Sequence, residues 1–396
     1  STARCASATS TRGKRAPITG ESSPARSRIA ARSARQRAFV DAGGTVILEG
    51  TFSFVGETNE RPSGDRYVIL VASSVKIRGR NATILGGGSL PAGGFQSVFL
   101  VDSPDVEAEF HAIRFVEPVN AAIRVRASGD LRIADCEIDG VVPTDFFGSL
   151  NGAQGIDLRH GPFGDVEIAR NRIRVGGTDA DATGGIAVVG SAASVEITGN
   201  EVSETTSHGI NLQDVAGTAL IEGNVVVTGP IGRGGGAGQY VDALRVLGTG
   251  GYRVVDNAFD CGFENGAVVR VAATTNAVVR QNDITSSVAA DETPGAESVG
   301  LQVRGSATDT EVAGNRIRGR GRVAVSVVHS DFRLDRPDGT DGNPDGTTLT
   351  GNNVKPFDAT VATVEIGVGA MNTTITGGSG TIIDNGTNTV VNGAYH

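Results

Sequence analysis

The amino-acid sequence predicts an all-β, single-stranded parallel β-helix of about eleven coils, on three observations. A short phrase, apolar-x-apolar-x-x-Asn-x-apolar, recurs along most of the 396 residues. A second phrase of alternating apolar and variable residues stands about ten residues before most copies of the first. The composition has 57 glycines, 5% aromatic residues and no tryptophan. A core must therefore be built from Val, Ile, Leu and Ala, which suits stacked strands.

The first phrase predicts a column of stacked asparagines. One copy is Val166-Glu-Ile-Ala-Arg-Asn171-Arg-Ile173, and Cys136 occupies the same slot one repeat earlier. Asn tolerates the left-handed region that a bend between strands requires, and its side chain can hydrogen-bond from coil to coil. We therefore expect an asparagine ladder with an architectural role, at Asn171, Asn200, Asn224, Asn257, Asn282, Asn315 and Asn352.

The second phrase predicts one short strand in each coil. Its copies alternate apolar and variable positions, the period of a strand with one buried face. A repeat of this size cannot bury its apolar face alone and must stack on its neighbours. The copies include Gly155-Ile-Asp-Leu158, Gly185-Ile-Ala-Val188, Gly209-Ile-Asn-Leu212, Ala243-Leu-Arg-Val246, Val268-Val-Arg-Val271 and Gly300-Leu-Gln-Val303.

The two ends are predicted to differ from the repeats, which form one β-helix domain over 43–390. Residues 26–42 have a helix-forming composition, and a helix there would cap the open end of the apolar stack. Residues 1–25 are interpreted as a disordered basic tail, because residues 1–38 carry nine basic residues and one acid. Residues 391–396 are expected to form a C-terminal tail.

Charge and composition exclude several classes of protein. The net charge is −9, and it is −17 without the basic start, which argues against nucleic acid as a partner. There is no run of about 18 apolar residues, so no membrane-spanning helix is expected, and no signal peptide is visible. The three cysteines match no zinc or redox spacing and are expected to be unpaired.

With these features the chain resembles, over residues 40–390, the right-handed parallel β-helix proteins of the pectate-lyase-like superfamily. The resemblance is carried by the opening Ala42-Gly-Gly-Thr-Val-Ile-Leu48, by Val75-Lys-Ile-Arg-Gly79, and by the closing Ile383-Asp-Asn-Gly386. The superfamily includes polysaccharide lyases, hydrolases and epimerases, and also phage tailspikes and adhesins. It implies that substrate lies along the sheet of the second phrase, between walls formed by the insertions at 140–153, 175–184, 228–241, 285–298 and 329–346.

The outward positions of these strands form a polar stripe with several arginines. Arginine matches carboxylates bidentately, so a uronate-containing, acidic polysaccharide is the predicted partner. The alternative is a solvated sheet face without a ligand. The candidate substrate-binding residues are Arg124, Arg126, Asn211, Gln213, Arg270 and Arg304.

His208 is the most specific catalytic candidate. The string Ser207-His-Gly-Ile-Asn-Leu212 resembles the Gly-His-Gly strand of polygalacturonases, and Arg245 stands where that family has the Arg of its next strand. The carboxylates of those hydrolases are missing, with Gln154, Thr183 and Gly184 at their positions. β-Elimination or epimerisation, which needs a base and cations, is therefore favoured over hydrolysis. The predicted catalytic residues are Asp157, Arg159, His208 and Arg245, with His160 as a further candidate.

A calcium loop is a separate hypothesis. Asp341, Asn343 and Asp345 have the first half of a calcium-loop spacing. The twelfth position is Asn352, a member of the asparagine column, so a full EF-hand is excluded and an acidic turn is the alternative.

The sequence thus favours an extracellular or cell- or virion-surface protein that binds an acidic polysaccharide and acts on it as a lyase or epimerase. A non-catalytic surface, adhesin or virion-spike protein is the alternative, and the oligomeric state stays open.

Overall fold

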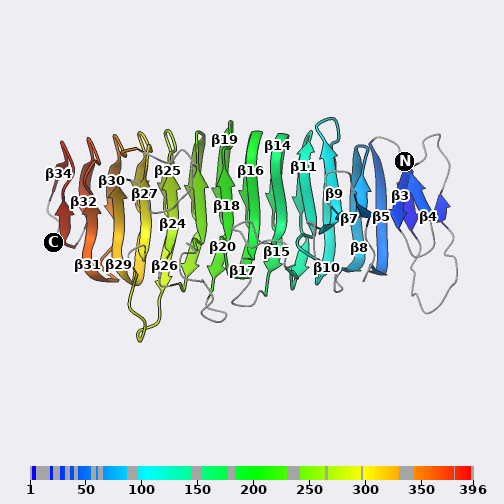
Figure 1. Cartoon of the computed structure of the whole chain (residues 1–396), viewed down its shortest axis with the longest axis horizontal. Coiled ribbons are helices and arrows are strands. Elements are labelled where there is room, and N and C mark those ends of the chain that lie inside the picture. Colours follow the sequence, from blue (N-terminus) through cyan, green and yellow to red (C-terminus); the bar gives the residue numbers. More distant parts are fainter. Residues whose placement is uncertain are drawn as a thin grey trace. The chain divides into compact units, whose positions relative to one another are not determined.

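The computed structural model confirms an all-β, right-handed parallel β-helix (Figure 1). It describes residues 2–5, 18–20, 27–31, 36–39, 43–54, 59–60, 66–86, 96–143, 153–176, 183–229, 241–263, 266–295, 298–329, 342–378 and 380–393. Within these ranges the regular elements are strands, and no helix occurs in them. The chain divides into two compact units, Ser1–Gly177 with Asp181–Ala193, and Thr178–Ala180 with Ser194–His396.

Unit 1 holds the strands up to the first part of β16. Their bounds are β1 (Thr2–Cys5), β2 (Ile18–Gly20), β3 (Ser27–Ala31), β4 (Gln36–Phe39), β5 (Gly44–Ser53), β6 (Asn59–Glu60), β7 (Arg66–Val71), β8 (Val75–Leu85), β9 (Gln96–Ser103), β10 (Ala108–Val116), β11 (Ile123–Ser128), β12 (Leu131–Ala134), β13 (Glu137–Asp139), β14 (Gln154–Ala169), β15 (Arg172–Arg174) and β16 (Gly184–Thr198). Strands of successive coils pair in parallel, as β8 does with β10 and β11 with β14.

Unit 2 continues the pattern from the end of β16. Its strands are β17 (Glu201–Thr205), β18 (Ile210–Gln213), β19 (Thr218–Glu222), β20 (Val225–Thr228), β21 (Leu244–Leu247), β22 (Gly251–Val255), β23 (Ala258–Cys261), β24 (Ala267–Ala272), β25 (Val278–Arg280), β26 (Asp283–Ser287), β27 (Val299–Arg304), β28 (Glu311–Ala313), β29 (Arg316–Val328), β30 (Thr348–Asn352), β31 (Phe357–Ile366), β32 (Thr374–Gly378), β33 (Ile382–Asp384) and β34 (Val390–Asn392). One parallel row runs β18, β21, β24, β27, β29, β31 and β33.

The core of each unit is the predicted aliphatic stack. The alternating residues of the second phrase, such as Ile156 and Leu158 in unit 1 and Ile210 and Leu212 in unit 2, are fully buried. The larger side chains of unit 1 form an aromatic cluster, with the Phe99 ring 5.1 Å from that of Phe110 and 6.0 Å from that of Phe115 between centroids. Burial of this apolar surface is the main stabilising contribution to such a rod.

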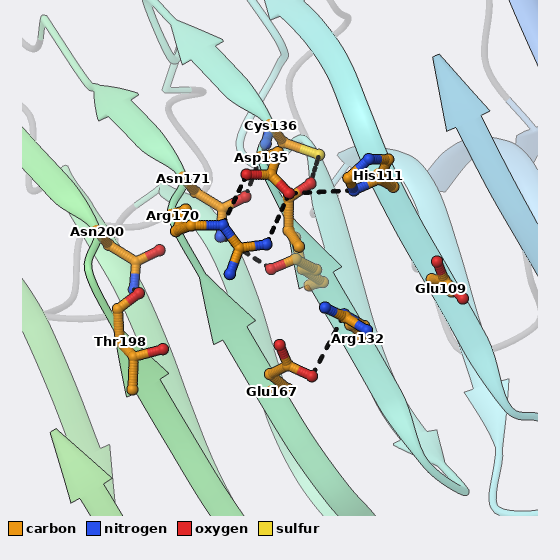
Figure 2. A network of polar contacts seen from close by, with 12 residues as sticks. Glu109, His111, Arg132, Asp135, Cys136, Glu167, Arg170, Asn171, Thr198 and Asn200 are labelled. Atoms are coloured by element: carbon orange, nitrogen blue, oxygen red, sulfur yellow. Dashed lines mark hydrogen bonds and ion pairs between the residues drawn. The ribbon is translucent and has the colours of Figure 1, made fainter. Parts of the chain in front are cut away.

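The asparagine ladder is confirmed in unit 2. From Asn200 to Asn315, the backbone N–H and the side-chain Nδ2 of each asparagine both donate to Oδ1 of the next, at 2.9–3.1 Å. In unit 1 the Cys136 N–H donates to Asn171 Oδ1 at 2.9 Å, so Cys136 does occupy an asparagine slot (Figure 2).

The bend itself is made by a different residue from the one the sequence predicted. The left-handed conformation belongs to the residue before each ladder position, as in Arg170 at φ 54°, Asp256 at φ 55° and Gly199 at φ 61°. Asparagine therefore stands in these slots for its amide, which accepts and donates between coils, and not for backbone tolerance.

The helix expected over 26–42 is wrong for the described residues. β3 and β4 lie there and pair with each other antiparallel, which satisfies their backbone groups locally. The expectation of a disordered start also fails at Thr2–Cys5, because β1 pairs in parallel with β5 and so covers an edge strand. The remaining residues of 1–25 lie outside the described ranges. β34 extends the last predicted strand two residues into the expected C-terminal tail.

Candidate functional site

The predicted outward positions of unit 2 form a row of polar side chains on neighbouring coils, in which Arg245 is partly buried and the other four side chains are buried. Residues of β18, β21, β24, β27 and β29 are paired directly across the row, in the order Asn211, Arg245, Arg270, Gln302 and Ser326. Their backbones are one coil apart, about 4.8 Å. Gln213 lies beside Leu247, and Arg304 beside Ala272 and Val328, so these two candidates lie in a second row two residues further along.

Four side chains converge at one end of this row. His208 Nε2 lies 3.3 Å from Arg245 Nη1, and His208 Nδ1 lies 3.4 Å from Asp242 Oδ2. Arg270 closes the group, with Nε 3.1 Å and Nη2 3.0 Å from Asp242 Oδ1. We call His208, Asp242, Arg245 and Arg270 the histidine cluster.

The local fold explains why these residues meet. His208 and Asp242 stand two residues before equivalent positions of β18 and β21, and the Gly209 N–H donates to the Asp242 carbonyl at 3.0 Å. On the next coil the same position is Ala267, whose N–H donates to Asp242 Oδ1 at 3.2 Å.

Asp242 is the functional candidate that sequence reasoning missed. The repeat pattern predicts outward-facing side chains only within the strands, and Asp242 lies just before β21. It is 1% exposed, whereas His208 is 8% exposed, so the ring stands between the carboxylate and the surface. One feature of the sequence points to Asp242: His208 and Asp242 each stand two residues before the first alternating apolar residue of the second phrase in adjacent repeats.

The candidates in unit 1 form a different group. Asp157 is fully buried, its Oδ2 is 2.7 Å from Arg124 Nη1, and its Oδ1 is 2.5 Å from Arg159 Nε. Arg126 Nε lies 4.0 Å from Asp102 Oδ1. We call Arg124, Asp157 and Arg159 the arginine clamp. Both carboxylate oxygens of Asp157 are held by guanidinium groups, which leaves it poorly placed to accept a proton.

The predicted catalytic set is therefore divided between the two units. Asp157 and Arg159 lie in unit 1, and His208 and Arg245 in unit 2. His160, the further candidate, is exposed and has a φ of 90°. Gln154 and Thr183, at the positions of the hydrolase carboxylates, are both buried in unit 1.

The calcium and groove-wall predictions fall largely outside the described residues, as Asp341 does. Of its partners, Asn343 Oδ1 lies 2.8 Å from His329 Nδ1, and Asp345 Oδ1 accepts from Asn372 Nδ2 at 2.8 Å. No group of three or more His, Cys, Asp or Glu side chains in the described ranges could hold a metal ion. The described donors are thus engaged with other side chains, and calcium binding by this loop stays a prediction.

The resolved pKa shifts belong to residues outside the histidine cluster. Burial raises the pKa of Cys136 to about 12, of Cys261 to about 11 and of Tyr252 to about 12. Burial also raises the pKa of Asp260. On another face of unit 1, the hydrogen bonds of Arg170 lower the pKa of Asp135, which also lies 3.2 Å from His111 Nδ1 (Figure 2). Cys136 and Cys261 are both free thiols.

Searches of known proteins agree with the fold. No curated protein matches the chain. The crystal structure of PfbA, a surface adhesin of Streptococcus pneumoniae, is similar at a TM-score of 0.56 and 13% identity, over 85% of this chain and 81% of that one. DFA-IIIase from Arthrobacter chlorophenolicus A6 is similar at 0.47 and 17% identity, over 84% and 83%. The A-module of the Azotobacter vinelandii mannuronan C-5 epimerase AlgE6 is similar at 0.45 and 15%, over 89% and 91%.

Identities this low show the fold alone. In the described part of the chain, no helix has the length and apolar character needed to cross a membrane. A family model, described as a right handed beta helix region, matches residues 98–317, more than half of the sequence. The chain therefore belongs to the right-handed β-helix family.

Proposed function

We propose that this protein binds an acidic, uronate-containing polysaccharide along the outward row of unit 2 and acts on it as a lyase or epimerase. The observation that carries the proposal is the contact between His208 Nε2 and Arg245 Nη1 at 3.3 Å. Arginine only donates hydrogen bonds, so Nε2 is the accepting, unprotonated nitrogen of a neutral imidazole. A neutral histidine beside a fixed cation has the two groups that this chemistry requires.

In the proposed step Arg245 leaves His208 Nε2 and binds the uronate carboxylate. The freed Nε2 takes the proton on the carbon next to that carboxylate, and Arg245 stabilises the negative charge that develops there. In β-elimination the electron pair forms a carbon–carbon double bond and expels the glycosidic oxygen, which takes a proton from water. In epimerisation water supplies a proton to the opposite face of the same carbon. Asp157 is replaced as the candidate base by His208, because the arginine clamp holds both its oxygens.

The test is incubation with pectate, alginate and hyaluronan. A lyase produces an unsaturated sugar that absorbs in the ultraviolet, and an epimerase incorporates deuterium from D₂O at the reacting carbon. His208→Ala and Arg245→Ala should each abolish either signal. His111→Ala is the matched control, because His111 also pairs with an aspartate but on the exposed face of Figure 2. Activity that survives both cluster substitutions would exclude this site.

A non-catalytic binding role at a cell or virion surface is the second candidate. It is favoured by the arginine clamp, because the one carboxylate there is buried and both its oxygens are held by arginines, so the clamp offers charge but no accessible base. The adhesin similarity is compatible with it at the level of fold. Retention of the wild-type protein on an immobilised acidic polysaccharide, without turnover of any of the three polymers, would favour this role. An extracellular or surface location is part of both proposals.

A further inference from the structure

We infer that Asp242 is a positioning residue that sets the tautomer of His208, so that Nε2 and not Nδ1 is the basic nitrogen. This inference rests on the proposed function for its catalytic meaning, but the tautomer can be measured without substrate. Asp242 acts through His208 and has no assigned contact with the reacting atoms.

The Asp242 carboxylate is held in one orientation. Its Oδ1 accepts hydrogen bonds from the Ala267 N–H at 3.2 Å and from Arg270 Nε at 3.1 Å, and Arg270 Nη2 lies 3.0 Å away in an ion-pair contact. These contacts leave Oδ2 as the oxygen that faces the ring, 3.4 Å from His208 Nδ1. The carboxylate cannot rotate away without losing contacts to two residues.

The two ring nitrogens of His208 have neighbours of opposite hydrogen-bonding character. Arg245 lies at Nε2 and can only donate, whereas Asp242 Oδ2 lies at Nδ1 and, when ionised, can only accept. The Nδ1 contact has ion-pair distance but not hydrogen-bond geometry, so the carboxylate acts on Nδ1 through its charge. Both neighbours favour the same neutral tautomer, with the proton on Nδ1. A second-residue contact of this type commonly fixes which imidazole nitrogen reacts.

Asp242 also affects the charge balance when His208 becomes protonated. When Nε2 takes a proton, the imidazolium lies beside the Arg245 cation, and like charges in contact oppose the transfer. Asp242 supplies the opposing negative charge from a site that is 1% exposed and poorly screened. Asp242 and Arg245 both contact the ring, and Arg270 contacts Asp242.

Asp242→Asn is a sharp test because its amide has one allowed orientation. The Ala267 and Arg270 donors require the amide oxygen at the Oδ1 position, which places the NH₂ group against His208 Nδ1. That donor disfavours a proton on Nδ1, while Arg245 still disfavours a proton on Nε2. The preference for the Nδ1–H tautomer should therefore be lost, and part of the population would have its basic nitrogen turned away from Arg245 and substrate.

The measurement is ¹⁵N–¹H long-range NMR of protein labelled at histidine, with the His208 signals assigned by their loss in His208→Gln. We expect the Nδ1–H pattern in the wild type and the loss of that pattern in Asp242→Asn, with the signals of both ring nitrogens moved toward a mixture of the two tautomers. Glu365→Gln is the control: it removes a partly buried carboxylate that pairs bidentately with Arg322 at 2.7 Å, and it should leave the ring signals unchanged. An Nε2–H pattern in the wild type overturns the inference even if the variant does not fold.

Kinetics give the second readout. If the wild type is active, Asp242→Asn should lower kcat about 10²-fold or more, with KM nearly unchanged. The acidic limb of the kcat/KM profile should move to lower pH, because the imidazolium loses its anion. Loss of thermal stability with unchanged ring signals and an unchanged profile would make Asp242 merely structural. If the wild type is inactive on all three polymers but shows the Nδ1–H pattern, the proposed function is contradicted and the tautomer inference is supported.

Discussion

The arginine clamp of unit 1 and the histidine cluster of unit 2 use a buried aspartate in opposite ways. Asp157 and Asp242 both lie at or just before strands of the second phrase, and both are at most 1% exposed. Asp157 has two arginines, so its partners carry fixed charge. Asp242 has one arginine and one histidine, so one partner can change its charge. The two groups differ in the residues that pair with the aspartate and not in the aspartate itself. Two arginines make a structural ion pair, whereas a histidine partner makes the proposed proton-transfer site.

The largest expected effect is that of Asp157→Ala on stability. It leaves two guanidinium groups buried without their anion and should lower the free energy of unfolding by about 3–5 kcal/mol. Urea denaturation measures the loss. Asp358→Ala is the control, because the side chain of Asp358 is 80% exposed and lies 3.9 Å from Arg320 Nε; it should cost about 0.5 kcal/mol or less. Similar losses in both variants would contradict a structural clamp.

His208→Ala should have a small effect on stability and a large effect on activity. One of its partners keeps another contact, since Asp242 still pairs with Arg270, so the expected cost in unfolding free energy is about 1 kcal/mol. Any lyase or epimerase activity should fall about 10²- to 10⁴-fold, the usual contribution of a general base. Denaturation and the product assay on the same preparation separate the two effects. A stability loss as large as that of Asp157→Ala would erase the distinction between the two groups.

A half-buried carboxylate outside both groups should respond to pH in a third way. The hydrogen bonds of Arg170 hold the pKa of Asp135 below its usual value of 3.8, so the folded state favours the ionised form. The stabilisation is therefore present above about pH 4 and is lost as the pH falls through the lowered pKa. The difference in melting temperature between wild type and Asp135→Asn should be small at pH 7 and should vanish near pH 2. A difference that grows on acidification would reverse the assigned direction.

The smallest expected signal comes from the two buried thiols, one in each unit. At pH 8 a thiol with a pKa of about 12 is ionised in about one molecule in 10⁴, and Cys261, at about 11, is little better. In a Cys5→Ser background, neither should be alkylated by iodoacetamide until its surroundings open. Peptide mapping over time therefore compares local opening of the units. Rapid labelling of both native thiols would contradict their burial.

The sequence by itself determined the repeat and most of its architecture. Alternating apolar residues predicted the strands because a strand has a period of two, and the asparagine column predicted a ladder that unit 2 contains. The slot of Cys136 and the pairing of Asn211, Arg245 and Arg270 followed from the same spacing. These features depend only on which residues recur at equal intervals, and so they can be read from a single chain.

Only the tertiary structure decided which charges meet. Repeat spacing places Arg124 beside Asp157 but does not show that Arg159 takes the second oxygen, nor that Asp242 joins His208 to Arg270. Those choices depend on how far each side chain reaches across coils. The start of the chain failed as a prediction for a related reason: its composition allows a helix, but pairing with available strand edges favours β1 to β4.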